Sequence, residues 1–150
     1  MALILGAFDR YGSAIVNIRV AGINPLAGIN PPREYTAVVD TRFNAFIAMP
    51  IAAMIDLGLK SEGAAKVTLG DGSTIDNFVA RGAVTLGSQT KMCDILLDEN
   101  STEILIGLSL LRGFKLGLVI TDTIVLLYDE QETLGTVAAF VSGLPRPDTR

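Results

Sequence analysis

The segment from Tyr35 to Pro50 contains the residues with the clearest potential for chemistry. An apolar, strand-like run ends at Asp40, and Thr41 and Arg42 follow it directly. A carboxylate at the end of a strand can be held by backbone N–H groups and can then act as a general acid or base. For this acid taken by itself, the commoner role is simply to cap a turn.

The residue types that are missing narrow the chemistry. The chain has no histidine, which excludes a Ser-His-Asp triad, a Cys-His pair and a histidine-ligated zinc. Its one cysteine, Cys93, excludes an intrachain disulfide and fits a reducing compartment. We expect Cys93 to be a buried apolar residue and not a nucleophile, because the sequence shows no cationic partner for it. Catalysis would therefore depend on carboxylates, lysine, serine, threonine or tyrosine.

Size and composition predict one ordinary globular domain. The chain has 150 residues, of which 49% are apolar and 19% charged, so intrinsic disorder is excluded as its main state. Its net charge is −4 without a cluster of lysine or arginine, and no nucleic-acid partner is expected. The apolar run from Ile104 to Leu111 is far shorter than the ~20 residues of a membrane span, and the first residues lack the basic region of a secretory signal. We expect a cytoplasmic protein that makes no membrane contact and self-associates.

Alternating apolar residues and frequent turn residues predict a mainly-β domain. The expected strands are 14–20, 34–39, 66–69, 73–86 with a bulge or bend at Gly82, 93–97, 104–107, 114–118, 124–128 and 136–141. A loop is expected at 22–33. Short helices are expected at 50–57, with Pro50 in its first turn and Gly58 after its end, and at 108–112. We expect a single domain over 1–150, with its core at about 13–128 and a frayed tail at 142–150.

Three segments form a pattern along the chain. The first places Val39, Thr41, Phe43, Asn44, Phe46 and Pro50 around Asp40. The second, 67–75, has the form of a hairpin with Gly70-Asp71-Gly72 at its turn, and the third, Ile104-Leu105-Ile106-Gly107, precedes a short helix and Gly113-Phe114. In this order they resemble the active-site loop, the flap hairpin and the apolar-apolar-Gly segment of the retropepsin-like aspartic proteases, in particular of bacterial single-domain members. The resemblance covers about residues 13 to 120.

The resemblance implies a mainly-β closed barrel with one or two short helices, which works as a homodimer and hydrolyses peptide bonds. Asp40 from each copy would form a carboxylate pair that shares one proton. One member would act as a base on water, and the other would donate to the scissile carbonyl oxygen. Thr41 would bond across the dimer axis, and Gly70, Asp71 and Gly72 would form a flap over an extended peptide. No metal or cofactor is implied.

The chain departs from the family motif at two positions, because Arg42 and Ala45 stand where the family has glycine. A positive φ at Arg42 would cost about 1 kcal/mol or more. An arginine beside a carboxyl also favours its ionised form. Two inward-pointing Arg42 side chains would therefore leave the pair without a proton to donate, whereas side chains in solvent would be screened.

Three hypotheses about function follow from these residues. The first is an active aspartic peptidase with Asp40, Thr41 and Arg42 at its catalytic loop. The second is a catalytically inactive relative that keeps the fold, the dimer and a cleft that binds peptide or protein partners. The third is an unrelated β-rich structural protein.

Overall fold

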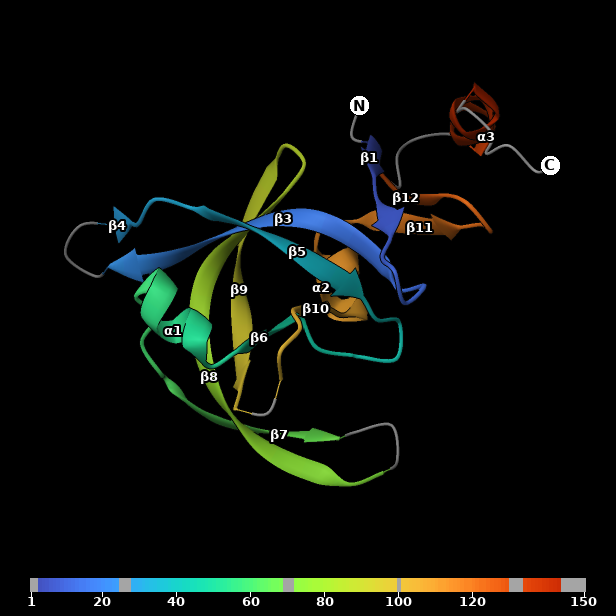
Figure 1. Cartoon of the computed structure of the whole chain (residues 1–150). Coiled ribbons are helices and arrows are strands. Elements are labelled where there is room, and N and C mark those ends of the chain that lie inside the picture. Colours follow the sequence, from blue (N-terminus) through green and yellow to red (C-terminus); the bar gives the residue numbers. More distant parts are fainter. Residues whose placement is uncertain (1–2, 25–27, 69–71, 100, 130–133, 144–150) are drawn as a thin grey trace.

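The computed structural model describes residues 3–24, 28–68, 72–99, 101–129 and 134–143. Their strands are β1 (Leu3–Leu5), β2 (Ala7–Phe8), β3 (Ala14–Asn24), β4 (Gly28–Ile29), β5 (Arg33–Val39), β6 (Ile47–Pro50), β7 (Gly63–Thr68), β8 (Thr74–Leu86), β9 (Gln89–Asp98), β10 (Leu105–Ile106), β11 (Leu116–Ile120) and β12 (Val125–Asp129). Their helices are α1 (Ala52–Leu57), α2 (Leu108–Gly113) and α3 (Leu134–Gly143). Figure 1 shows a barrel with α1 and α2 against it, a smaller sheet at one side, and α3 next to that sheet.

Six strands close the barrel in the order β3-β5-β10-β6-β9-β8, with β8 pairing back onto β3. Most neighbours are antiparallel, but β5 and β10 run parallel, as do β6 and β9. The short strand β10 lies between β5 and β6 and bonds to both of them. The mainly-β closed barrel that the sequence predicts is therefore confirmed.

Two glycines allow the barrel to close. Gly22 of β3 pairs with Gly82 of β8. A Cβ on Gly22 would lie 2.0 Å from the carbonyl oxygen of Leu57, at the end of α1, and a Cβ on Gly82 would lie 2.7 Å from the side chain of Ile95. The β8–β9 ladder runs without an extra residue from Phe78 to Leu86, so the alternative of a bulge at Gly82 is wrong. Close packing explains this glycine, and β8 curves along its length instead (Figure 1).

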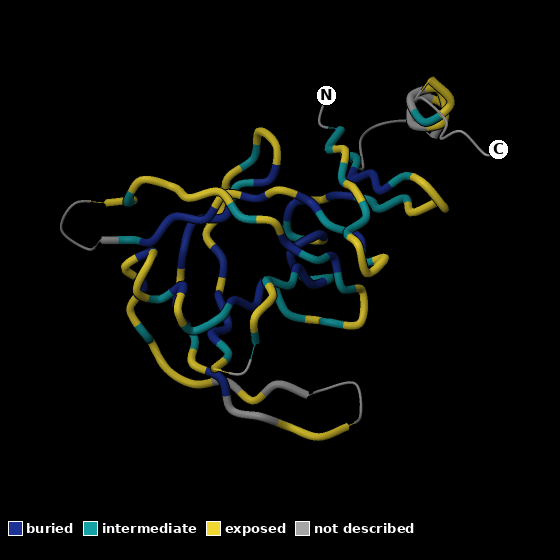
Figure 2. Tube along the Cα trace, viewed as in Figure 1, coloured by how far each residue is buried: buried dark blue, intermediate teal, exposed yellow. Residues whose placement is uncertain are grey.

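The core occupies the inside of the barrel, where Figure 2 colours long stretches of the chain dark blue for buried residues. Val16, Ile18 and Val20 of β3 are at most 2% exposed, while the residues between them face outward. On β9, Cys93, Ile95 and Leu97 form a second buried row, at most 4% exposed. The strict alternation in the sequence therefore predicted correctly which faces of these strands are buried.

A second sheet has the order β1-β12-β11 and is antiparallel throughout. Its central strand is buried, since Val125, Leu126 and Leu127 have no exposed surface. The sequence predicted β11 and β12 but not β1 and β2, which are too short to show a period. Within the described ranges, no helix combines the length and the hydropathy that crossing a bilayer requires.

The structure corrects further sequence predictions. The expected loop at 22–33 is partly strand, because β3 continues to Asn24 and β4 pairs back onto it, Ile23 opposite Ile29. Pro50 does not start a helix but ends β6, where it pairs with Asp98 of the parallel strand β9, and α1 begins at Ala52. Segment 136–141 lies in α3 instead of a strand, and α3 also includes residues 142 and 143 of the expected tail, whose remainder, 144–150, lies outside the described residues. Its small residues are compatible with a helix, and a local apolar run does not distinguish the two states.

Candidate active site

Asp40 stands where β5 leaves the barrel, and its backbone is fixed by β10. The two strands run parallel with Val39 opposite Ile106. The N–H of Val38 donates to the carbonyl of Ile104 at 2.7 Å, and the N–H of Asp40 donates to the carbonyl of Ile106 at 2.9 Å. The ladder thus extends past the end of β5 and determines where the carboxyl group emerges.

The carboxyl group of Asp40 holds its own turn together. Its Oδ1 accepts a hydrogen bond from the N–H of Arg42 at 3.0 Å. The backbone carbonyl oxygen of Asp40 accepts another from the N–H of Phe43 at 3.1 Å. Within the described chain, Oδ2 accepts no hydrogen bond. Asp40 is half-buried, and Thr41 and Arg42 are exposed. The simple interpretation of Asp40 as a turn cap is therefore correct for one oxygen, while the other is left for an external partner.

The segment after β10 packs against the loop that follows Asp40. A Cβ on Gly107 would lie 2.1 Å from the carbonyl oxygen of Ala45, so no side chain fits there. The N–H of Gly107 donates to the carbonyl of Phe46 at 3.0 Å, and the Ser109 hydroxyl donates to the carbonyl of Asn44. The apolar-apolar-Gly segment that the sequence singled out therefore packs directly against the Asp40 loop.

Arg42, at the position where the sequence resemblance expects glycine, shows no backbone strain. Among the described non-glycine residues, only Lys115 has a positive φ, at 53°. The cost of about 1 kcal/mol or more expected for a left-handed Arg42 does not arise. In the described part of the chain, its guanidinium has no hydrogen bond and no ion pair, including none to Asp40. A single copy thus has Arg42 in solvent.

A second turn lies beside the Asp40 loop and was not found from the sequence. β3 pairs with β5 so that Ile15 lies opposite Val38, which brings the β2–β3 turn to the end of β5 that carries Asp40 (Figure 1). In this turn, Oδ1 of Asp9 accepts the N–H groups of Tyr11 and Ser13, each at 2.9 Å.

The same turn presents an exposed aromatic ring. Arg10 lies over the ring of Tyr11, 4.8 Å from its centre, and donates to its hydroxyl at 2.7 Å. Tyr11 is 75% exposed. The sequence Asp9-Arg10-Tyr11 is ordinary for a turn. The pair of Arg10 and Tyr11 is therefore notable only for its position in the folded chain.

The predicted flap is the hairpin of β7 and β8. The two strands pair from Gly63 opposite Val79 to Thr68 opposite Thr74. The hairpin extends from the barrel on the side to which the segment between β5 and β6 projects (Figure 1). Gly72 has a φ of 86°, a conformation typical of a turn glycine, and is exposed. Gly70 and Asp71 lie outside the described residues.

Two other ionisable groups lie away from this loop. Burial raises the pKa of the Cys93 thiol to about 11, with the charge of Asp94 adding to the shift. Burial also raises the pKa of Tyr35, and the charge of Asp56 raises it further as the smaller cause. Tyr35 and Asp56 line a surface pocket of about 390 Å³ to which Asp40 does not contribute. In the described ranges, no three acidic or cysteine side chains gather as metal ligands would.

Comparison with known proteins gives a match among solved structures. No protein-family model and no curated protein matches this sequence. A solved structure does match, that of a retropepsin-like aspartic protease from Rickettsia conorii, with a TM-score of 0.59 and 22% sequence identity. The match covers 84% of this chain and 89% of the other. The chain has the retropepsin-like fold.

The retropepsin-like fold accounts for the order of the three sequence landmarks. The Asp40 loop, the β7–β8 hairpin and the β10–α2 segment occur in the order the sequence resemblance predicted, on one closed barrel. The structure brings Asp40, Thr41 and Arg42 together with Gly107 and its neighbours. The roles assigned to Asp40, Thr41, Arg42 and the 70–72 turn stay predictions.

Proposed function

We propose that this chain is an aspartic endopeptidase that cleaves peptide bonds with two Asp40 carboxyl groups, one from each subunit of a homodimer. The observation that carries the proposal is the position of Asp40. On a retropepsin-like barrel, its carboxyl group emerges half-buried at the end of β5, with one oxygen held by the Arg42 N–H. One copy contributes one such group, so the reaction needs a second copy.

The proposed reaction uses one proton shared by the two carboxyl groups. The ionised Asp40 takes a proton from a water molecule, whose oxygen attacks the scissile carbonyl carbon, while the protonated Asp40 of the other subunit donates to the carbonyl oxygen. The tetrahedral intermediate then collapses. The C–N bond breaks as the nitrogen takes the proton that the first Asp40 gained from water, and a hydroxyl group of the intermediate returns a proton to the second Asp40. The new carboxyl group and amine then leave. No metal or cofactor takes part in this scheme.

The substrate in this proposal is an extended peptide. It would lie between the two Asp40 loops and the β7–β8 hairpins and pair with them through its backbone, with alternate side chains in pockets. Thr41, which is exposed next to Asp40, would bond its counterpart across the dimer axis. The Gly70-Asp71-Gly72 turn would close over the peptide. A buried, unpaired cysteine is consistent with the proposed location in the cytoplasm.

Arg42 favours a second candidate function. In a dimer whose two Arg42 side chains point toward the carboxyl groups, the guanidinium groups would favour the ionised form of both carboxyls. Such a site has no proton to donate, and the protein would bind peptides or protein partners without cleaving them. The exposed, unpaired Arg42 of the described single chain supports the active enzyme as the first candidate.

The deciding experiment is cleavage of a peptide library between pH 3 and 8 by the wild-type chain, Asp40→Ala and Arg42→Gly, each checked for its dimer by sedimentation. Cleavage by the wild type that is lost in Asp40→Ala and blocked by a pepstatin-like inhibitor supports the endopeptidase. Cleavage by Arg42→Gly alone supports the inactive relative. A chain that stays monomeric at high concentration contradicts both candidates.

A further inference from the structure

We infer that Arg42 is a specificity residue that selects peptides with an aspartate or glutamate beside the cleaved bond. The inference rests on the proposed function, since it concerns the substrate of the same cleft. It begins from what Arg42 does in the chain. Its backbone N–H holds Oδ1 of Asp40, but its guanidinium has no partner among the described residues and lies in solvent.

The structural task of Arg42 is thus performed by its backbone alone. Any residue except proline supplies that N–H, and the backbone here is not left-handed, so the turn requires neither arginine nor glycine. The guanidinium is a planar group with donors that match a carboxylate in pairs, and it stays charged at every relevant pH. A free guanidinium is therefore a ready receptor for a carboxylate.

Arg42 lies close enough to Asp40 to contact a substrate bound there. Two residues span at most about 7 Å of chain, so the Cα of Arg42 lies within that distance of the Cα of Asp40. From there, an extended arginine side chain can reach a peptide whose carbonyl group meets Oδ2 of Asp40. The substrate residues next to the cleaved bond are the ones that meet it.

The charge of the cleft supports an acidic residue at that place. Two Asp40 groups with one shared proton carry a charge of −1, and two Arg42 groups carry +2, so the floor of the cleft is at +1. With glycine at position 42 the same floor would be at −1. The adjacent turn does not change the charge of this floor, because Asp9 and Arg10 offset each other in each copy, and the negative charge of Asp71 in the proposed flap belongs to the opposite side of the peptide. On a chain with a net charge of −4, the cleft floor is a local positive site.

The test uses three peptides that carry an uncleavable statine-type unit and have Glu, Gln or Lys beside it. Their binding to the full-length dimer is measured by fluorescence anisotropy. We expect the Glu peptide to bind at least about fivefold more tightly than the Gln peptide. This factor corresponds to the strongest salt bridges typically measured between exposed side chains. We expect the Lys peptide to bind most weakly. Arg42→Gln should abolish the preference for Glu, and Arg42→Lys should keep part of it.

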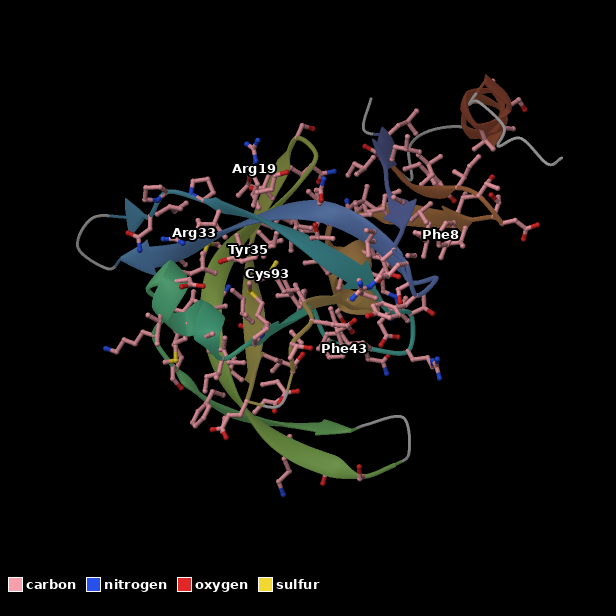
Figure 3. The ribbon with its side chains drawn as sticks, in the orientation of Figure 1. Phe8, Arg19, Arg33, Tyr35, Phe43 and Cys93 are labelled. Carbon is pink, nitrogen blue, oxygen red and sulfur yellow. The ribbon has the colours of Figure 1, made fainter. Side chains whose placement is uncertain are left out.

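Arg19→Gln is the matched control, because it removes the same charge from an exposed position on β3. Figure 3 places Arg19 well apart from Phe43, the residue that follows Arg42. This variant should keep the full preference. Equal binding of the Glu and Gln peptides by the wild type, or equal loss of preference in Arg19→Gln, would overturn the inference while leaving the proposed function intact. Absence of binding and cleavage by both wild type and Arg42→Gly would instead overturn the proposed function.

Discussion

Gly107 and Ala45 approach each other so closely that a Cβ on Gly107 would lie 2.1 Å from the carbonyl oxygen of Ala45. This contact joins the end of β10 to the loop that carries Asp40. The clash would be with backbone, which cannot rotate away as a side chain can. The position of the candidate catalytic carboxyl group therefore depends on a glycine that is distant in the sequence.

Gly107→Ala should lower the free energy of unfolding by about 1–3 kcal/mol or more, the range typical of overpacked interiors. Urea denaturation followed by circular dichroism measures this loss. Gly113→Ala is the control, because a Cβ there would meet only Phe46, at an ordinary 3.7 Å. That variant should be nearly as stable as the wild type or more so. Equal stability of Gly107→Ala and Gly113→Ala would show that the Asp40 loop does not pack as described.

Arg42→Gly should change the stability of the chain only slightly. Because Arg42 is not in a left-handed conformation, glycine relieves no strain and instead adds freedom to the unfolded chain. We expect the free energy of unfolding to fall by about 0.4–1 kcal/mol, measured by the same denaturation experiment. A clear gain in stability would mean that arginine is strained at this position.

Tyr35→Phe should leave stability unchanged or raise it. The hydroxyl of Tyr35 is buried and, among the described residues, has no hydrogen-bond partner. Burying an unpaired polar group costs about 1–3 kcal/mol, and removing the hydroxyl recovers part of this. Tyr11→Phe is a suitable comparison, since that hydroxyl is exposed and bonded to Arg10. Marked destabilisation by Tyr35→Phe would reveal a partner for the hydroxyl, such as a bound water molecule.

Cys93 should make folding stability depend on alkaline pH. Its pKa rises from 9.0 to about 11 on folding, so the folded chain holds the thiol proton more tightly than the unfolded chain does. Its contribution is fully present below pH 9 and is lost as the pH rises toward about 11. The free energy of unfolding should therefore fall less steeply between pH 9 and 11 in Cys93→Ala than in the wild type. Parallel pH profiles would contradict this assignment.

The same burial should protect the thiol from reagents. Cys93 is 4% exposed, and its raised pKa leaves it as the neutral thiol near pH 8. Ellman's reagent should therefore react slowly with the folded chain and at the ordinary rate after denaturation. Fast labelling of the folded chain at pH 8 would show that Cys93 is accessible.

Five of the six barrel strands, and the end of β5 at Asp40, were predictable from the sequence because their signals are local, whereas the sequence analysis missed β6. Alternating residues such as Val16, Ile18 and Val20 determine which face of a strand is buried wherever it pairs. The apolar strand before Asp40 and the apolar-apolar-Gly segment before α2 are likewise readable along the chain, and their resemblance to the retropepsin-like proteases correctly predicted the fold.

Other features were decided by contacts between distant parts of the chain. Pro50 ends a strand because β9 and β10 lie on either side of β6, and nothing near Pro50 in the sequence encodes those neighbours. The sequence predicted a strand at 136–141 because an apolar run of that length fits a strand as well as the observed helix. The turn with Arg10 and Tyr11 gains its place beside Asp40 only through the β3–β5 register.

Arg42 shows the division most clearly. Its place two residues after Asp40 is a fact of the sequence, and so is the positive charge that it adds there. Its backbone conformation and its lack of a partner among the described residues are properties of the folded loop, which is held by hydrogen bonds from β10 and the segment after it. Local residue types determine which interactions are possible, whereas the long-range pairing of strands determines which of them form.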